Sequence, residues 1–171
     1  NILILNDPEA DGYYDLLPID FEYSGYNFRG FDIGNHFNEW CYDYTYSQPP
    51  YFSYHFEDYP TLAQQEEFWS AYLTARQNDR RMSVDVNRSS GGTFNDGSAR
   101  PPVYEDAKRD FEKLWLEATF GALYSHLFWA AWALIQTQIS SIRFGFSHYA
   151  TARMDAYHRM KKSLQSHLEQ R

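Results

Sequence analysis

The sequence is poor in cysteine and in basic side chains, and each shortage argues against a class of protein. A single cysteine, Cys41, among 171 residues excludes an internal disulfide framework and fits a reducing compartment, so we expect a cytoplasmic protein. Fifteen lysines and arginines against 23 aspartates and glutamates leave a net charge of −8, which argues against a nucleic-acid partner and favours a cationic one. No apolar run approaches the roughly 20 residues of a membrane span, so no transmembrane segment is expected.

Aromatic residues, in contrast, are abundant. They make up 19% of the chain, and hydrophobic residues as a whole make up 43%, over a length that suits one domain or a large part of a bigger one. Rings in such number either fill a core or build a ligand site. The chain begins directly with the apolar stretch NILIL, so we expect the C-terminal portion of a longer protein.

Hydrophobic spacing and turn residues predict a hairpin followed by helices. Two apolar strands, 1–5 and 13–20, flank the turn signals Asp-Pro and Asp-Gly, and Pro18 favours an edge or a bulge for the second strand. Thr61 and Gln64 stand in capping-box register at the start of one helix. The spacing predicts helices over 31–44, 60–77, 104–141 and 148–168, and the polar stretch 79–102 predicts a mobile loop.

The stretch IDFEYSGYNFRGFDIGNHFNEW, residues 19–40, mixes carboxylates with aromatic rings. Metal ions bind carboxylate oxygens, whereas an organic cation binds both carboxylates and ring faces. In protein kinases, the Asn that closes the catalytic loop and the Asp of a D-F-G triplet hold Mg²⁺. Asn1 and Asp20-Phe21-Glu22 stand in the same order around the predicted hairpin, but an Asn and an Asp that merely flank a hairpin would look the same.

Further rings recur near the end of the chain. Trp129 and Trp132 lie three residues apart on a predicted helix and share one face, and Phe144 and Tyr149 follow just past it. These rings form either a cage for a quaternary ammonium group or a stripe that packs into the core. The histidines offer no comparable metal pattern because they stand far apart in the sequence, and we expect core or surface positions for His36, His126 and His148.

Two long blocks carry a family resemblance. Residues 19–44, IDFEYSGYNFRGFDIGNHFNEWCYDY, and residues 126–157, HLFWAAWALIQTQISSIRFGFSHYATARMDAY, resemble choline kinases and lie in that family's order. The resemblance implies an α+β, protein-kinase-like fold, of which this chain is the mostly helical C-terminal lobe without the ATP lobe. It divides the chain into a metal-binding hairpin (1–23), a helical part (24–79), a flexible loop (80–103) and long helices that line a choline pocket (104–171).

The resemblance also implies a reaction, the Mg²⁺-dependent transfer of the γ-phosphate of ATP to choline, which is the first step of phosphatidylcholine synthesis. Asn1 and Asp20 match the family's catalytic, metal-binding positions, and Glu22 lies beside the metal. Glu39 is the expected counter-charge in a choline site whose matching positions are Tyr23, Glu39, Tyr44, Trp129, Trp132, Phe144 and Tyr149.

Other residues near these blocks receive supporting roles. Asp32 and Asn35 are expected to brace the catalytic loop and the start of a helix. Arg29 is expected to pair with one of the acidic residues of this segment. The family's catalytic Asp falls upstream of Asn1, so the chain alone is expected to be inactive and to need the N-terminal part of the kinase as a partner. A homodimer is an expectation from the family alone.

Two alternatives stay open at this point. Ethanolamine kinases share the fold and the chemistry, although EWCYDYTY, with Tyr44, is closer to the choline branch. A non-catalytic choline-binding module built on a kinase remnant would also explain the cage, but it has no need for the metal-binding residues.

Overall fold

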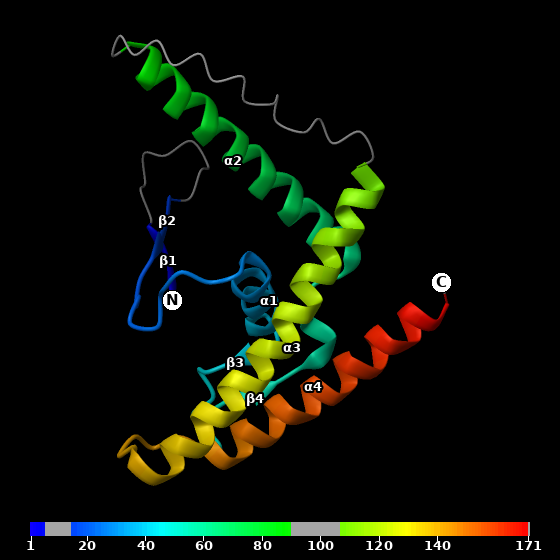
Figure 1. Ribbon diagram of the computed structural model, residues 1–171. Helices are drawn as coiled ribbons and strands as arrows, with labels where there is room; N and C mark the ends of the chain where they lie inside the picture. The colour runs from blue at the N-terminus through cyan, green and yellow to red at the C-terminus, as the bar shows by residue number, and fades with distance from the viewer. Residues whose placement is uncertain (6–14, 90–106, 171) are drawn as a thin grey trace.

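The computed structural model describes residues 1–5, 15–89 and 107–170, which are mostly helical (Figure 1). The helices are α1 (Arg29–Glu39), α2 (Leu62–Ser89), α3 (Ala107–Ile139) and α4 (Phe146–Glu169), with a short 3₁₀ turn at Phe56–Asp58. Two small antiparallel sheets accompany them, formed by β1 (Ile2–Leu5) with β2 (Asp15–Pro18) and by β3 (Tyr42–Asp43) with β4 (Ser53–Tyr54).

Helices α1 and α3 cross at very close range because glycines line their contact. A Cβ atom on Gly121 would lie 1.8 Å from the Gly30 carbonyl oxygen, and one on Gly34 would lie 2.3 Å from the Ala122 backbone nitrogen. The apolar face of α1 is buried in the same region through Ile33 and Phe37. This contact sets the position of α1, and therefore of Glu39 at its end, relative to α3.

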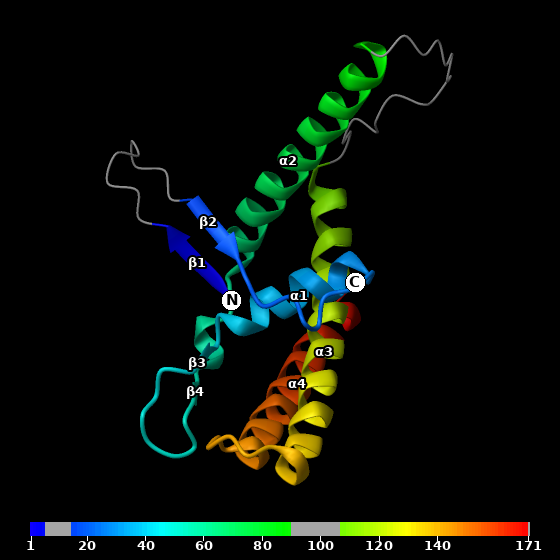
Figure 2. The same cartoon turned by 90° about the vertical axis from the view of Figure 1, so that its left-hand side faces the viewer.

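Helix α4 runs back along α3, as Figure 2 shows from the side. Leu123 of α3 packs with Met160 and Leu164 of α4 in a shared core. The stretch Phe111–Ile139 of α3 is long and apolar enough to cross a membrane by length and composition, so the expectation that no stretch would approach this limit was wrong. Half of its most apolar window is buried inside the molecule, and the central helix of a soluble core passes the same test.

The predicted hairpin is confirmed. Ile2 pairs with Pro18 and Leu5 with Asp15 in antiparallel register, and the residues that connect the strands lie outside the described part of the chain. Pro18 ends β2 in a two-stranded sheet, where each strand is an edge and a missing N–H is tolerated.

The helix predicted over 31–44 was wrong at its end. Helix α1 stops at Glu39, and Tyr42–Asp43 instead pairs with Ser53–Tyr54 as a small sheet. Aromatic residues continue past the helix end, so hydrophobic spacing could not mark the boundary. Local hydrogen bonds stabilise the chain where it leaves β3. The side chain of Asp43 accepts hydrogen bonds from both the backbone nitrogen and the hydroxyl of Thr45, at 2.8 and 2.7 Å.

The capping box at the start of α2 is confirmed, with Thr61 N bonded to Gln64 Oε1 at 2.8 Å and Gln64 N to Thr61 Oγ1 at 3.4 Å. The loop predicted from residue 79 or 80 was wrong as far as residue 89, which α2 includes. No glycine or proline interrupts α2 before Gly91, and polarity alone does not end a helix. The rest of that predicted loop lies outside the described residues. The two later helices are confirmed within a few residues of their predicted bounds.

Candidate active site

Helices α3 and α4 bring the predicted aromatic residues together. The Trp129 and Trp132 rings meet edge to face with centroids 5.3 Å apart, and Tyr23 approaches Trp129 at 5.6 Å. On the other side, Phe144 lies 5.6 Å from Tyr149. We call these residues, with Tyr44 at 6.2 Å from Tyr149, the aromatic cage: Tyr23, Tyr44, Trp129, Trp132, Phe144 and Tyr149.

One ring that the sequence argument missed joins the two halves of the cage. Phe146, the first residue of α4, lies 5.8 Å from Trp132 and 5.0 Å from Phe144. It is buried, whereas Trp132 and Phe144 are partly exposed. Its place in the apolar run IRFGF was the available signal, but a helix start cannot be oriented from sequence spacing alone.

Hydrogen bonds orient both tryptophans of the cage. Trp132 Nε1 donates to the Tyr23 hydroxyl at 2.9 Å, which ties the segment after the hairpin to α3. Trp129 Nε1 donates to Asn35 Oδ1 at 2.8 Å, and Ser125 Oγ donates to the same oxygen at 2.7 Å. Asn35 therefore braces α1 against α3 and sets the Trp129 ring.

A charged network forms one wall of the cage. Glu39 Oε2 accepts a hydrogen bond from the Tyr44 hydroxyl at 2.8 Å, and the Tyr44 and Tyr149 hydroxyls are 3.1 Å apart. Arg153, one turn after Tyr149 on α4, pairs with Glu39 Oε1 and donates from Nε to the Tyr149 hydroxyl at 2.9 Å. The predicted counter-charge of the site thus has a cationic partner of its own, and this partner was missed from the sequence.

Burial sets the protonation of this network. It raises the pKa of Tyr149, which is 4% exposed, and it raises that of Tyr44 at the inner, hydroxyl end of a ring whose residue is 48% exposed; Glu39 adds to the effect on each. Both side chains therefore stay neutral hydroxyls. Burial alone would lower the pKa of Arg153, but Glu39 and the surrounding tyrosines raise it above the ordinary arginine value, so the guanidinium stays charged.

Asn1 and Asp20 meet at the hairpin. Asn1 Nδ2 donates to Asp20 Oδ2 at 3.0 Å, and the backbone nitrogen of Ile19 donates to the Asn1 carbonyl at 2.9 Å. Asp20 adopts a left-handed backbone conformation (φ 65°), which Asp tolerates better than most residues. Glu22 follows two residues later with its side chain exposed.

This donor set fits Mg²⁺. The ion is commonly held by one or two carboxylates together with substrate phosphates, and Asp20, Glu22 and the amide oxygen of Asn1 are hard oxygen donors of this kind. Within residues 1–5, 15–89 and 107–170, no three His, Cys, Asp or Glu side chains gather as a preformed metal cluster. An ion bound at the hairpin would therefore take most of its other ligands from elsewhere.

The remaining candidates lie apart from both groups. Arg29, which was expected to pair with an acid near it in the sequence, forms a two-pronged contact with Glu117 of α3, with nitrogen–oxygen distances of 3.0 and 2.6 Å. His126 is buried in α3, and burial, helped by Arg153, lowers its pKa to about 3. His36 is partly buried and stacks on the Phe68 ring at 5.2 Å.

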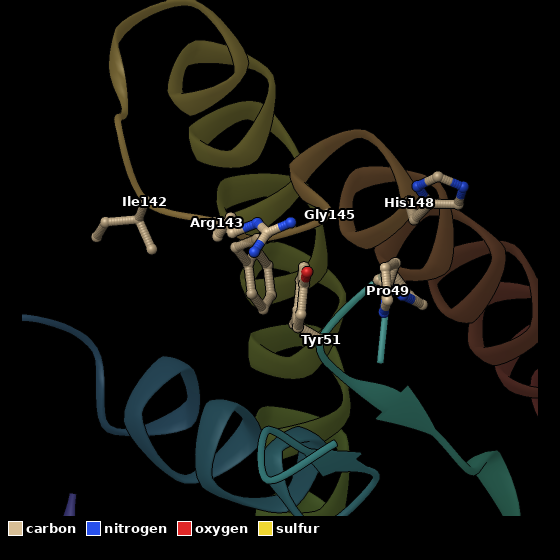
Figure 3. A pocket seen from close by; sticks show the side chains of 8 residues that line it. Pro49, Tyr51, Ile142, Arg143, Gly145 and His148 are labelled. Atoms are coloured by element: carbon tan, nitrogen blue, oxygen red, sulfur yellow. The ribbon is translucent and has the colours of Figure 1, made fainter. Parts of the chain in front are cut away.

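An open cleft borders the cage at Phe144. It has a volume of about 350 Å³ and lies where the loop around Pro49–Tyr51 meets the connection between α3 and α4 (Figure 3). Arg143 and His148 line it, and the backbone nitrogen of Gly145 donates to the Pro50 carbonyl at 2.9 Å across its base. Phe144 is the residue that the cleft shares with the cage.

Comparison with known proteins shows which family this chain resembles. A family model described as choline/ethanolamine kinase matches residues 1–158. The chain belongs to the choline/ethanolamine kinase family. Choline kinase alpha of Mus musculus is 43% identical over 164 residues, which cover 96% of this chain and 32% of that protein. Ethanolamine kinase 1 of Homo sapiens is 33% identical over 161 residues, or 93% of this chain and 28% of that protein.

A solved structure agrees with the family assignment. The crystal structure of a choline kinase from Cryptosporidium parvum Iowa II matches with a TM-score of 0.70 at 28% identity, covering 98% of this chain and 37% of that one. The resemblance carried by residues 19–44 and 126–157 is confirmed, and so is the mostly helical, protein-kinase-like fold that begins with a short hairpin. The chain spans about a third of the length of the curated relatives it matches.

Proposed function

We propose that this chain forms the choline-binding part of a kinase that transfers the γ-phosphate of ATP to choline. The observation that carries the proposal is the cage, in which rings from α3, α4 and the segments flanking α1 converge beside Glu39. Ring faces attract a quaternary ammonium group by about 0.5–2 kcal/mol each and ask for no hydrogen bond in return. A trimethylammonium head fits these requirements.

Two groups of residues have separate roles in this reaction. The cage binds the trimethylammonium head and thereby orients the choline hydroxyl. Asn1 and Asp20, with Glu22 beside them, would hold Mg²⁺, which when bound neutralises charge on the phosphates of ATP. Together they would set the acceptor hydroxyl against the phosphate, and positioning of this kind supplies most of the catalysis in phosphoryl transfer.

Ethanolamine is the competing substrate because the family contains kinases named for either alcohol. The hydroxyl of Tyr44 supports choline, since it closes the cage by bonding to Glu39 and approaching Tyr149. A homodimer stays a prediction of the resemblance, and a cytoplasmic location stays a prediction from the single cysteine.

Phosphorus NMR of the protein as the cell makes it, supplied with MgATP and either choline or ethanolamine, tests the proposal. We expect a phosphocholine signal to form faster than phosphoethanolamine. Asp20→Asn should slow both reactions by about 100-fold or more, because it removes a charged ligand of the metal. Binding of choline without any phosphoester product would contradict the kinase and favour the non-catalytic module.

A further inference from the structure

Arg153 is a fully buried charge on the otherwise apolar face of α4. Its solvent exposure is 0%, among buried neighbours such as Tyr149, Ala150 and Ala156 on the same helix. The guanidinium carbon lies 4.1 Å from the centre of the Tyr42 ring and 4.9 Å from that of Tyr149. A buried charge is costly unless it is paired, so the position demands the partners that Arg153 has in Glu39 and Tyr149.

The hydrogen bonds around Arg153 run in one direction. Its Nε and Nη2 both donate to the Tyr149 hydroxyl oxygen and so occupy both lone pairs of that oxygen. Tyr149 is then the donor to Tyr44, because Tyr44 uses its own proton for Glu39 Oε2. Nη2 also pairs with Glu39 Oε1, which closes the circuit.

This circuit changes what the wall of the cage offers to a ligand. The positive charge of Arg153 offsets the negative charge of Glu39, and each carboxylate oxygen already accepts a hydrogen bond. The Tyr149 oxygen has no lone pair left. A quaternary head, which has no N–H groups, leaves no hydrogen bond unmade at such a wall. A primary ammonium has three N–H donors and would leave water without full replacement of its hydrogen bonds.

We propose that Arg153 is the positioning residue that makes the cage selective for a quaternary over a primary ammonium group. The inference rests on the proposed function, since it concerns the choice of substrate at the same site. Arg153 acts through Glu39 and Tyr149, by fixing the direction of their hydrogen bonds and by cancelling the charge of Glu39. A merely structural arginine would support the fold without affecting the ratio between substrates.

The test compares kcat/KM for choline with kcat/KM for ethanolamine in the protein as the cell makes it. Arg153→Met frees Glu39 to accept hydrogen bonds from a primary ammonium, so the choline-to-ethanolamine ratio should fall by about tenfold, the effect of one charge-assisted hydrogen bond. Arg153→Lys keeps the positive charge but loses the planar guanidinium that donates to two partners at once, and should give an intermediate ratio. Arg159→Met, an exposed change on the same helix, should leave the ratio unchanged.

A second variant keeps the test decisive if Arg153→Met does not fold. Tyr149→Phe retains the ring but removes the hydroxyl that donates to Tyr44, which frees the Tyr44 oxygen to accept a hydrogen bond from a primary ammonium, so the ratio should fall in the same direction by a smaller factor. Equal losses for both substrates in the variants that fold would overturn the role of Arg153. A wild-type protein that phosphorylates neither alcohol would overturn the proposed function instead, so the two failures are distinguishable.

Discussion

The hairpin and the aromatic cage are built in opposite ways. Ile4 and Leu16 on the hairpin are 59% and 61% exposed, and Asn1 and Asp20 meet on its surface. In the cage wall, Tyr149 is 4% exposed and Arg153 is fully buried. Helices α1, α3 and α4 therefore hold this wall of the cage in shape by their own packing, whereas the hairpin presents its side chains with little support from the rest of the described chain.

The contrast has a functional consequence. A cage wall held by buried contacts, as at Tyr149 and Arg153, would be in place before a ligand binds, which lowers the cost of ordering side chains on binding. Under the proposed function, the exposed donors of the hairpin would gain their geometry only with the ion and the phosphates. Binding of the alcohol and transfer of the phosphate should therefore respond to different substitutions.

The largest effect should come from breaking the packing that supports the cage. In Gly121→Ala, the new Cβ would meet backbone atoms of Gly30, and neither helix can yield by rotating a side chain. We expect a loss of about 3 kcal/mol or more in the free energy of unfolding, measured by urea denaturation. Gly25→Ala is the matched control, because a Cβ there has nothing within 4 Å, and its stability should match the wild type. Equal stability of the two variants would show that the close contact of α1 and α3 contributes little to the stability of the fold.

A smaller effect concerns the pH dependence of the helical core. His126 is buried on α3, and burial, helped by Arg153, lowers its pKa to about 3, whereas an unfolded histidine titrates near 6.5. Below pH 6.5 the unfolded state binds a proton that the folded state does not. The contribution of His126 to stability is therefore complete above pH 6.5 and is lost as the pH falls from there towards 3. Between pH 6.5 and 5 this amounts to about 2 kcal/mol.

Urea denaturation at pH 7 and at pH 5 measures this loss. His126→Gln should reduce the difference between the two pH values, while His158→Gln, an exposed change on α4, should leave it as in the wild type. An unchanged difference in His126→Gln would mean that other groups govern the acid sensitivity of the core.

Much of the fold followed from local patterns. The hairpin, the capping box of α2 and the two last helices were all predicted, because strand pairing, caps and helical spacing leave short-range signals. The end of α1 and the length of α2 were not. The first depends on the pairing of Tyr42–Asp43 with a strand ten residues later, and the second on a helix that continues through polar residues.

The site was predicted less completely for a similar reason. The rings of the cage were found through the family blocks, and the structure brings them together, but their role in binding choline stays a prediction. Arg153 and Phe146 were missed because their importance depends on contacts between α4 and distant segments. An arginine on the apolar face of a helix was the one available signal, and only a knowledge of which side chain faces Glu39 turns it into a partner.

The most direct test asks whether the cage serves choline binding and the hairpin serves phosphate transfer, and it applies two measurements to each of two variants. Choline affinity is measured by titration calorimetry, and phosphocholine formation by phosphorus NMR, in Trp132→Ala and in Asp20→Asn. Trp132→Ala should weaken choline binding by about tenfold while the affinity for ATP is kept, and Asp20→Asn should keep the choline affinity within about twofold while the reaction is lost. Equal losses of choline and ATP affinity in Trp132→Ala, or lost choline binding in Asp20→Asn, would contradict the account.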